Sequence, residues 1–201
     1  MNPAVHAQGE AMTSFEFVFG LISVITSLAL TRLLGACVDL YRHIDRVRFS
    51  WRHACWTAIA FMLLVGNWAA FWRLRTTQSW GVLDVLFPLV FLSVLYAYCD
   101  LVMPERPDGD EILDLREFHE RHGKRYVLVQ LVFAVLAVLV LAYGAADFKQ
   151  WLESARFAIV ATFLNAVALR ARSVWLDTTA AVLLTLLAAA FMLARLNTLS
   201  S

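Results

Sequence analysis

The chain has 201 residues, of which 61% are hydrophobic and 16% are charged, and its mean hydropathy is +0.67. Soluble domains carry about 25% charged residues, and a soluble domain of this length could not bury so much apolar surface. The composition therefore excludes a soluble globular domain, a disordered chain and a disulfide scaffold, and favours a protein that lies in a bilayer. The net charge of +1 gives no basis for a nucleic-acid partner.

Six apolar segments are each close to the length of about 20 helical residues that crosses a hydrocarbon core of about 30 Å. The predicted spans are 15–36, 55–72, 80–103, 126–146, 151–169 and 174–194. We expect an all-α polytopic bundle in which residues 1–13 form an N-terminal tail and residues 14–201 form a single six-helix transmembrane domain.

The first span carries small and polar residues along one helical face. At 100° per residue, the residues of this stripe lie within about 60° of Glu16. One interpretation is a tight helix–helix seam, because small side chains let backbones approach and hydroxyls bond across the contact. The other is a hydrophilic pore wall with Glu16 at its mouth. The polar stripe consists of Glu16, Gly20, Ser23, Ser27 and Thr31.

The third span contains a proline beside an acidic side chain. Pro88 lacks an N–H and frees the backbone carbonyl of Asp84. That carbonyl and the Asp84 carboxylate could together bind a cation or a water molecule. The alternative is a proline kink repaired by a neighbouring helix, with Asp84 paired to Arg156. Asn67 on the second span is expected at a similar depth.

Charged residues near the other membrane face are expected to form structural ion pairs. Arg32, which lies about 160° from Glu16 around the first helix, can pair with Asp100 or with Asp177. Ionisable groups inside a membrane are costly, so each one is a candidate for function. The candidate intramembrane polar residues are Glu16, Ser23, Ser27, Thr31, Arg32, Asn67, Asp84, Asp100, Arg156 and Asp177.

The stretch before the fourth span is charged with interspersed apolar residues. It predicts a short amphipathic helix on the membrane surface, capped by Asp108 or Asp110 and ended by Gly123. His119 and His122, spaced i and i+3, could bind a metal ion there, but a solvated helix face is the favoured interpretation.

Catalytic motifs are absent from the sequence, which contains no GxSxG, HExxH or P-loop pattern. Cys37, Cys55 and Cys99 form no CxxC pair and are expected to be reduced, buried thiols. Among the histidines only His53 approaches the membrane, and a haem would need a second ligand at the same depth. We therefore expect no enzyme activity, no catalytic residue, no cofactor and no metal site.

The loops predict an orientation. Eleven Lys and Arg residues lie in the loops after the first, third and fifth spans, and four lie on the opposite side. The positive-inside rule then puts both termini outside a bacterial inner membrane. Tryptophans near the span ends are typical of an aromatic belt at the two interfaces; they are Trp51, Trp72, Trp80, Trp151 and Trp175.

Two stretches, SFEFVFGLISVITSLALTRLLG and DLREFHERHGKRYVLVQ, resemble a broad group of small, uncharacterised bacterial integral membrane proteins. The resemblance covers about a fifth of the chain and implies no particular activity. The size and the six spans are also similar to those of the small prokaryotic relatives of the lysosomal potassium channel. The Phe-Ser-Asp signature of those channels is missing, because residues 14–17 read Ser-Phe-Glu-Phe. That similarity therefore concerns architecture only.

These observations favour a homo-oligomeric channel-like or transporter-like membrane protein whose polar first helix lines the path. Its expected partners are the lipid bilayer, further copies of itself and a small cation, attracted by Glu16 and Asp84. The alternative is a non-catalytic scaffold or an accessory subunit of a larger membrane complex.

Overall fold

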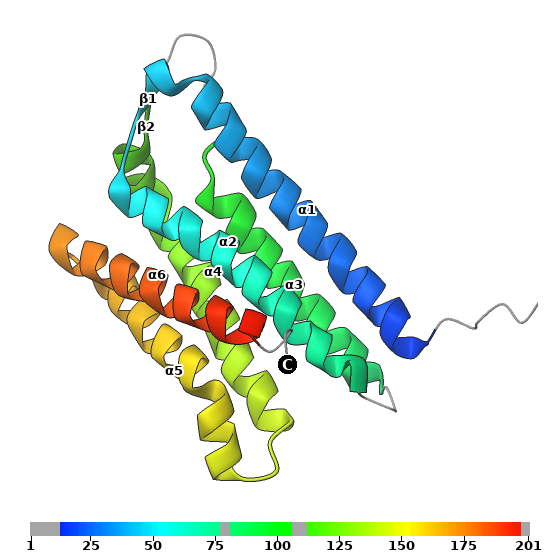
Figure 1. Ribbon diagram of the computed structural model, residues 1–201. Helices are drawn as coiled ribbons and strands as arrows, with labels where there is room; N and C mark the ends of the chain where they lie inside the picture. Colours follow the sequence, from blue (N-terminus) through cyan, green and yellow to red (C-terminus); the bar gives the residue numbers. More distant parts are fainter. Residues whose placement is uncertain (1–12, 77–80, 106–111, 198–201) are drawn as a thin grey trace, which may run out of the picture.

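The computed structural model describes residues 13–76, 81–105 and 112–197, and it contains six long helices (Figure 1). Each helix is long and apolar enough to cross a membrane, so the predicted all-α fold is confirmed, and its six apolar helices suggest a multi-pass membrane protein. The helices are α1 (Ser14–Arg42), α2 (Trp51–Phe71), α3 (Val82–Val102), α4 (Leu115–Tyr143), α5 (Phe148–Arg170) and α6 (Val174–Leu196).

Five of these helices form a ring. Each of α2, α3, α4, α5 and α6 packs against the next, and α6 closes the ring on α2. Helix α1 packs outside the ring, against α3 and α2, and lies on the opposite edge of the bundle from α5 (Figure 1). We call the end that carries the α1–α2, α3–α4 and α5–α6 connections the Arg52 end, and the opposite end the Asp84 end.

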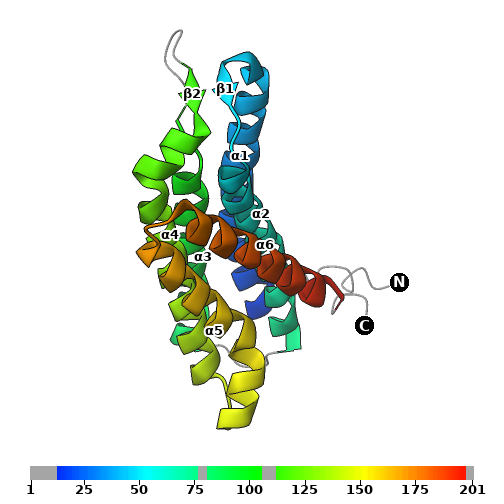
Figure 2. The same cartoon turned by 90° about the vertical axis from the view of Figure 1, so that its left-hand side faces the viewer.

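Two short strands join the connections at the Arg52 end. Strand β1 (Val47–Arg48) follows the 3-10 helix η1 (Ile44–Arg46) and pairs in parallel with β2 (Leu113–Asp114) (Figure 2). Arg48 also lies 3.8 Å from the Asp114 carboxylate. This pairing ties the α1–α2 connection to the start of α4. At the other end of α2, the 3-10 helix η2 (Trp72–Thr76) follows directly.

Side-chain caps explain where the helices begin. Thr13 and Glu16 form a capping box at the start of α1: the Thr13 hydroxyl accepts the Glu16 N–H at 3.2 Å, and the Glu16 carboxylate accepts the Thr13 N–H at 2.8 Å. Asp114 accepts the N–H groups of Arg116 and Glu117 at the start of α4. Because helix N-terminal N–H groups lack partners within the helix, such side chains set the boundary.

Helix α4 corrects one expectation. The predicted surface helix ending at Gly123 is not separate, because α4 runs without a break from Leu115 to Tyr143; Asp108 and Asp110 lie outside the described residues. Gly123 is buried beneath the His119 ring, and a Cβ atom there would lie 3.0 Å from the ring carbon Cε1. The glycine therefore makes room for a buried histidine instead of ending a helix.

Candidate functional site

The helix ring encloses a cavity of about 450 Å³, lined by residues of α2, α3, α4, α5 and α6. Its volume falls within the range of about 300–1,000 Å³ that is typical of small-molecule sites. On α4 the lining extends from Gln130 to Gly144, which at 1.5 Å per residue is about 20 Å. The cavity is thus elongated along the bundle axis.

The cavity opens at the Asp84 end and is closed in the middle of the bundle. The lining residues Asp84, Tyr143 and Gly144 are exposed at the ends of their helices. At the closed floor, Ile59 and Asn165 have no exposed surface, and the neighbouring lining residues are also buried. The lining is mainly aromatic and aliphatic and includes Phe87, Phe91, Phe133, Phe157 and Phe191.

Three carboxamide side chains interrupt this apolar wall. Asn67, Gln130 and Asn165 are 7%, 3% and 0% exposed, respectively, and all three line the cavity. The Nδ2 groups of Asn67 and Asn165 each donate to a carbonyl of their own helix at 2.8 Å. The carbonyl oxygens of Gln130 and Asn165 are buried, and no donor among the described residues reaches them. The floor of the cavity therefore holds two buried acceptors that have no partner in the described part of the chain.

The structure brings together two of the candidates predicted near this face. Asn67 and Asp84 line the same cavity, together with Pro88. The Asp84 carboxylate accepts the Gly81 N–H at 2.8 Å at the start of α3. An ion pair with Arg156 is not among those of the described residues; the Arg156 guanidinium lies 5.2 Å from the Phe157 ring centroid instead. The proposed Asp84–Arg156 pair is therefore wrong.

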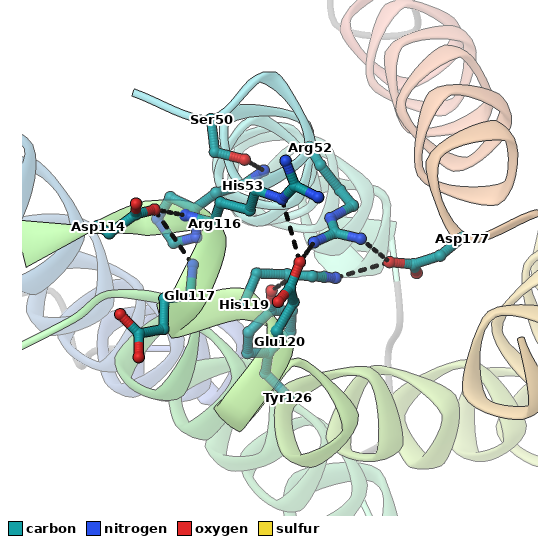
Figure 3. Close-up of polar contacts among 10 residues, drawn as sticks. All are labelled: Ser50, Arg52, His53, Asp114, Arg116, Glu117, His119, Glu120, Tyr126 and Asp177. Carbon is teal, nitrogen blue, oxygen red and sulfur yellow. Dashed lines mark hydrogen bonds and ion pairs between the residues drawn. The ribbon is translucent and has the colours of Figure 1, made fainter. Parts of the chain in front are cut away.

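A second polar site lies at the Arg52 end, and Figure 3 shows that its side chains come from α2, α4 and α6. The Arg52 side chain is 9% exposed and lies 3.2 Å from Asp177 and 3.4 Å from Glu120. The His119 Nε2 atom lies 2.7 Å from the same Asp177 oxygen, and its Nδ1 atom bonds to the Tyr126 hydroxyl. We call these five residues the Arg52 cluster.

The Arg52 cluster joins three helices by paired charges and hydrogen bonds. A neutral imidazole with its proton on Nε2 donates to Asp177 and accepts the Tyr126 hydroxyl proton, which satisfies both ring nitrogens of His119. Trp56 stacks on the His119 ring, with ring centroids 6.3 Å apart and planes inclined by 21°. Since Tyr126 is fully buried and His119 is 5% exposed, this site is filled by its own side chains.

Two further charged candidates, Arg32 and Asp100, pair between α1 and the ring helix α3. Arg32 pairs with Asp100 at 2.7 Å, one of its two expected partners, and links α1 to α3. Both side chains are nearly half exposed. Asp177, the other expected partner, belongs to the Arg52 cluster instead.

The polar stripe of α1 faces away from the bundle. Glu16, Ser27 and Thr31 are exposed and Ser23 is half-buried, while a Cβ atom added to Gly20 would meet nothing within 4 Å. The tight seam expected from these residues is therefore not formed within the described bundle. The buried face of α1 is apolar and comprises Val18, Ile22, Ala29 and Leu33.

The histidines also differ from expectation. His119 is buried and bonded, so the solvated face predicted for it is wrong. Within the described ranges, no group of three or more His, Cys, Asp or Glu side chains could hold a metal ion. His53 is 2% exposed and lies beside Phe118, whereas the exposed His43 bonds to the Asp39 carbonyl of its own helix.

Sequence reasoning missed most of the residues that form the two polar sites. Gln130 is visible as the one strongly polar side chain of the fourth span, and Asn165 lies inside the fifth, more than a turn before its predicted end, so both give a usable signal. Arg52 and Tyr126 carry no such signal, because each lies near a predicted span end where polar side chains are ordinary. Comparisons of the chain with protein-family models, with curated proteins and with solved structures give no match.

Proposed function

We propose that the protein binds a largely apolar, lipid-like molecule in the cavity of the helix ring. The observation that carries this proposal is an elongated, aromatic-lined cavity of about 450 Å³ that opens at one end of a membrane bundle. An ion path needs polar groups along its length, whereas apolar side chains dominate this wall. An apolar chain fits both the length of about 20 Å and the lining.

The charge distribution supports an orientation for this site. The connections at the Arg52 end, together with the helix ends that flank them in sequence, account for the eleven basic residues counted above. We therefore place that end in the cytoplasm of a bacterium by the positive-inside rule. The cavity then opens toward the outer leaflet of the inner membrane, and both termini lie outside. Two reporters fused separately to the C-terminus test this orientation. One is active only in the cytoplasm, and the other is active only outside it.

Photolabelling tests the binding proposal. The probe is a long-chain alcohol that carries a diazirine on its chain, added to the purified protein in detergent. We expect labelling of cavity-lining side chains, and we expect Ala134→Phe to abolish it, because Ala134 is 3% exposed and lines the cavity. Val135→Phe is the matched control, since Val135 is the next residue of α4, 39% exposed, and outside the lining. Equal labelling of the two variants would refute the proposal.

A second candidate function is the homo-oligomeric cation channel. The observation that favours it is the outward-facing polar stripe of α1, which an axis formed by several copies could use as its wall. Cation flux into liposomes that contain the protein tests this function. Flux that stops in Ser27→Leu supports the channel, and flux no higher than in empty liposomes excludes it.

A further inference from the structure

The floor of the cavity has a defined hydrogen-bonding character. The Asn165 Nδ2 atom lies 2.8 Å from the Ala161 carbonyl, and only the nitrogen of a carboxamide can donate there. This bond fixes the orientation of the amide, so its second polar atom is an oxygen. The Asn165 side chain is fully buried, and its Oδ1 has no donor among the described residues.

Gln130, on the neighbouring helix α4, contributes a second buried amide oxygen. Its side chain is 3% exposed, it lines the same cavity from α4, and its Oε1 also lacks a donor in the described part of the chain. Helices α4 and α5 pack against each other, and both amides belong to the lining of the same cavity. Buried acceptors in folded proteins nearly always have a donor, so these two oxygens are the positions of the wall where a hydrogen-bond donor would be most favourable.

Resting on the proposed function, we propose that the cavity selects long-chain molecules that carry a hydroxyl group, and that this hydroxyl donates to the carboxamide floor. The apolar chain then extends past the phenylalanines toward the Asp84 end. A hydroxyl matches the site because it donates one hydrogen bond to a carbonyl oxygen and still accepts one from an amide N–H. An ether of the same length fills the same volume but donates nothing.

A matched pair of competitors tests this selectivity on the wild-type protein. A long-chain alcohol and its methyl ether compete separately with the photoreactive alcohol, and the concentration that halves the labelling is measured for each. We expect the alcohol to compete at a concentration about 10- to 100-fold lower than the ether, because the ether leaves the buried acceptors unmatched. We expect Asn165→Leu and Gln130→Leu to reduce this ratio while ether binding persists.

Thr162→Val is the control, since it removes a hydroxyl of α5 that donates to Ala158 and lies outside the cavity lining; its ratio should equal that of the wild type. Equal competition by alcohol and ether in the wild type would overturn the selectivity and assign the floor to ordered water, while the binding proposal stands. Failure of both compounds to compete, together with labelling that Ala134→Phe does not change, would overturn the binding proposal itself. Because the alcohol–ether comparison needs no substitution, it decides the question even if a variant misfolds.

Discussion

The two ends of the helix ring differ in whether most of their buried polar groups have hydrogen-bond or ion-pair partners. At the Arg52 end, the Arg52 guanidinium lies between Asp177 and Glu120, and the His119 ring bonds on both sides. Toward the Asp84 end, the ring helices surround a cavity, and at its floor the carbonyl oxygens of Gln130 and Asn165 have no donor among the described residues. One end is filled and paired, and the other is hollow and partly unpaired.

The difference shows how a small bundle can close one end and leave the other open. Buried charges are tolerated only when paired, so a cluster of them draws α2, α4 and α6 together. Carboxamides tolerate a missing bond at lower cost, so a wall that contains them can remain open. The pairing at the Arg52 end is not complete, because the His53 Nδ1 and Trp56 Nε1 atoms are also buried and have no partner within the described ranges.

The largest effect is expected from breaking the paired end. In Arg52→Ala the Asp177 carboxylate, 15% exposed, loses its guanidinium partner. Removing one partner of a buried ion pair costs about 3–5 kcal/mol. Because the Glu120 side chain is half exposed and exposed ion pairs contribute little, we expect Arg52→Ala to lose about 3 kcal/mol, at the lower end of this range. Reversible unfolding in mixed detergent micelles measures the change in free energy.

Arg32→Ala supplies the matched control for that measurement. It removes a guanidinium from another arginine–aspartate pair, but both partners are nearly half exposed. We expect a loss of about 0–1 kcal/mol, as for other exposed ion pairs. If the two variants lost equal stability, burial of the Arg52 cluster would not be what stabilises that end.

The effect of Gly123→Ala on stability should change sign when the His119 side chain is removed. The new Cβ would lie 3.0–3.2 Å from three atoms of the His119 ring, which Asp177 and Tyr126 hold on both sides. The overlap costs about 1–3 kcal/mol, and the better helix propensity of alanine returns about 1 kcal/mol, so the net loss is about 1 kcal/mol. In a His119→Ala background, the same substitution should stabilise by about 1 kcal/mol. A loss of the same size in both backgrounds would show that the ring is not the obstacle.

The hollow end should respond in the opposite direction. Gln130→Leu removes a buried acceptor that has no donor among the described residues, so we expect this ligand-free variant to gain about 1 kcal/mol. Asn165→Leu removes such an acceptor too, but it also loses the 2.8 Å bond from Nδ2 to the Ala161 carbonyl, so we expect its stability to change by less than about 1 kcal/mol. Tyr98→Phe is the counterpart, because the Tyr98 hydroxyl donates to the Trp56 carbonyl at 2.8 Å and its removal should lose about 1 kcal/mol. A destabilised Gln130→Leu variant would mean that water already occupies the floor.

The six spans could be predicted because hydrophobic length is a local property of the sequence. The continuation of the helix past Gly123 could not be predicted, because a glycine after a charged stretch is typical of a helix end. The structure shows that Gly123 lies inside α4 and leaves room for the His119 ring. The Arg32–Asp100 pair was among the expected ones because both residues lie near one membrane face. The Arg52 cluster joins residues up to 125 positions apart, from Arg52 to Asp177, and the order of the helices in the ring decides which of them meet.

The candidate site shows the same limit. Asp84 and Asn67 were expected at one depth, and the structure places them on one cavity. The polar stripe of α1 suggested a path along the first helix, but α1 packs outside the ring. A stripe on a helix gives its angular position around that helix and does not say which neighbour, if any, it faces.

The smallest effect is expected at the cap of α4, where the paired end begins. The N–H groups of Glu117 and then Arg116 hold the pKa of Asp114 below its usual value, with a further contribution from Arg48. A lowered folded-state pKa means that the contribution to stability is present above the unfolded-state pKa of about 4 and is lost as the pH falls through the folded-state value. Asp114→Asn keeps an N-cap acceptor but no charge, so at pH 7 we expect only a few-fold faster hydrogen exchange at the first amides of α4. The difference from wild type should vanish in acid, where the aspartate is also neutral, and a difference that persists there would show that the charge is not what stabilises the cap.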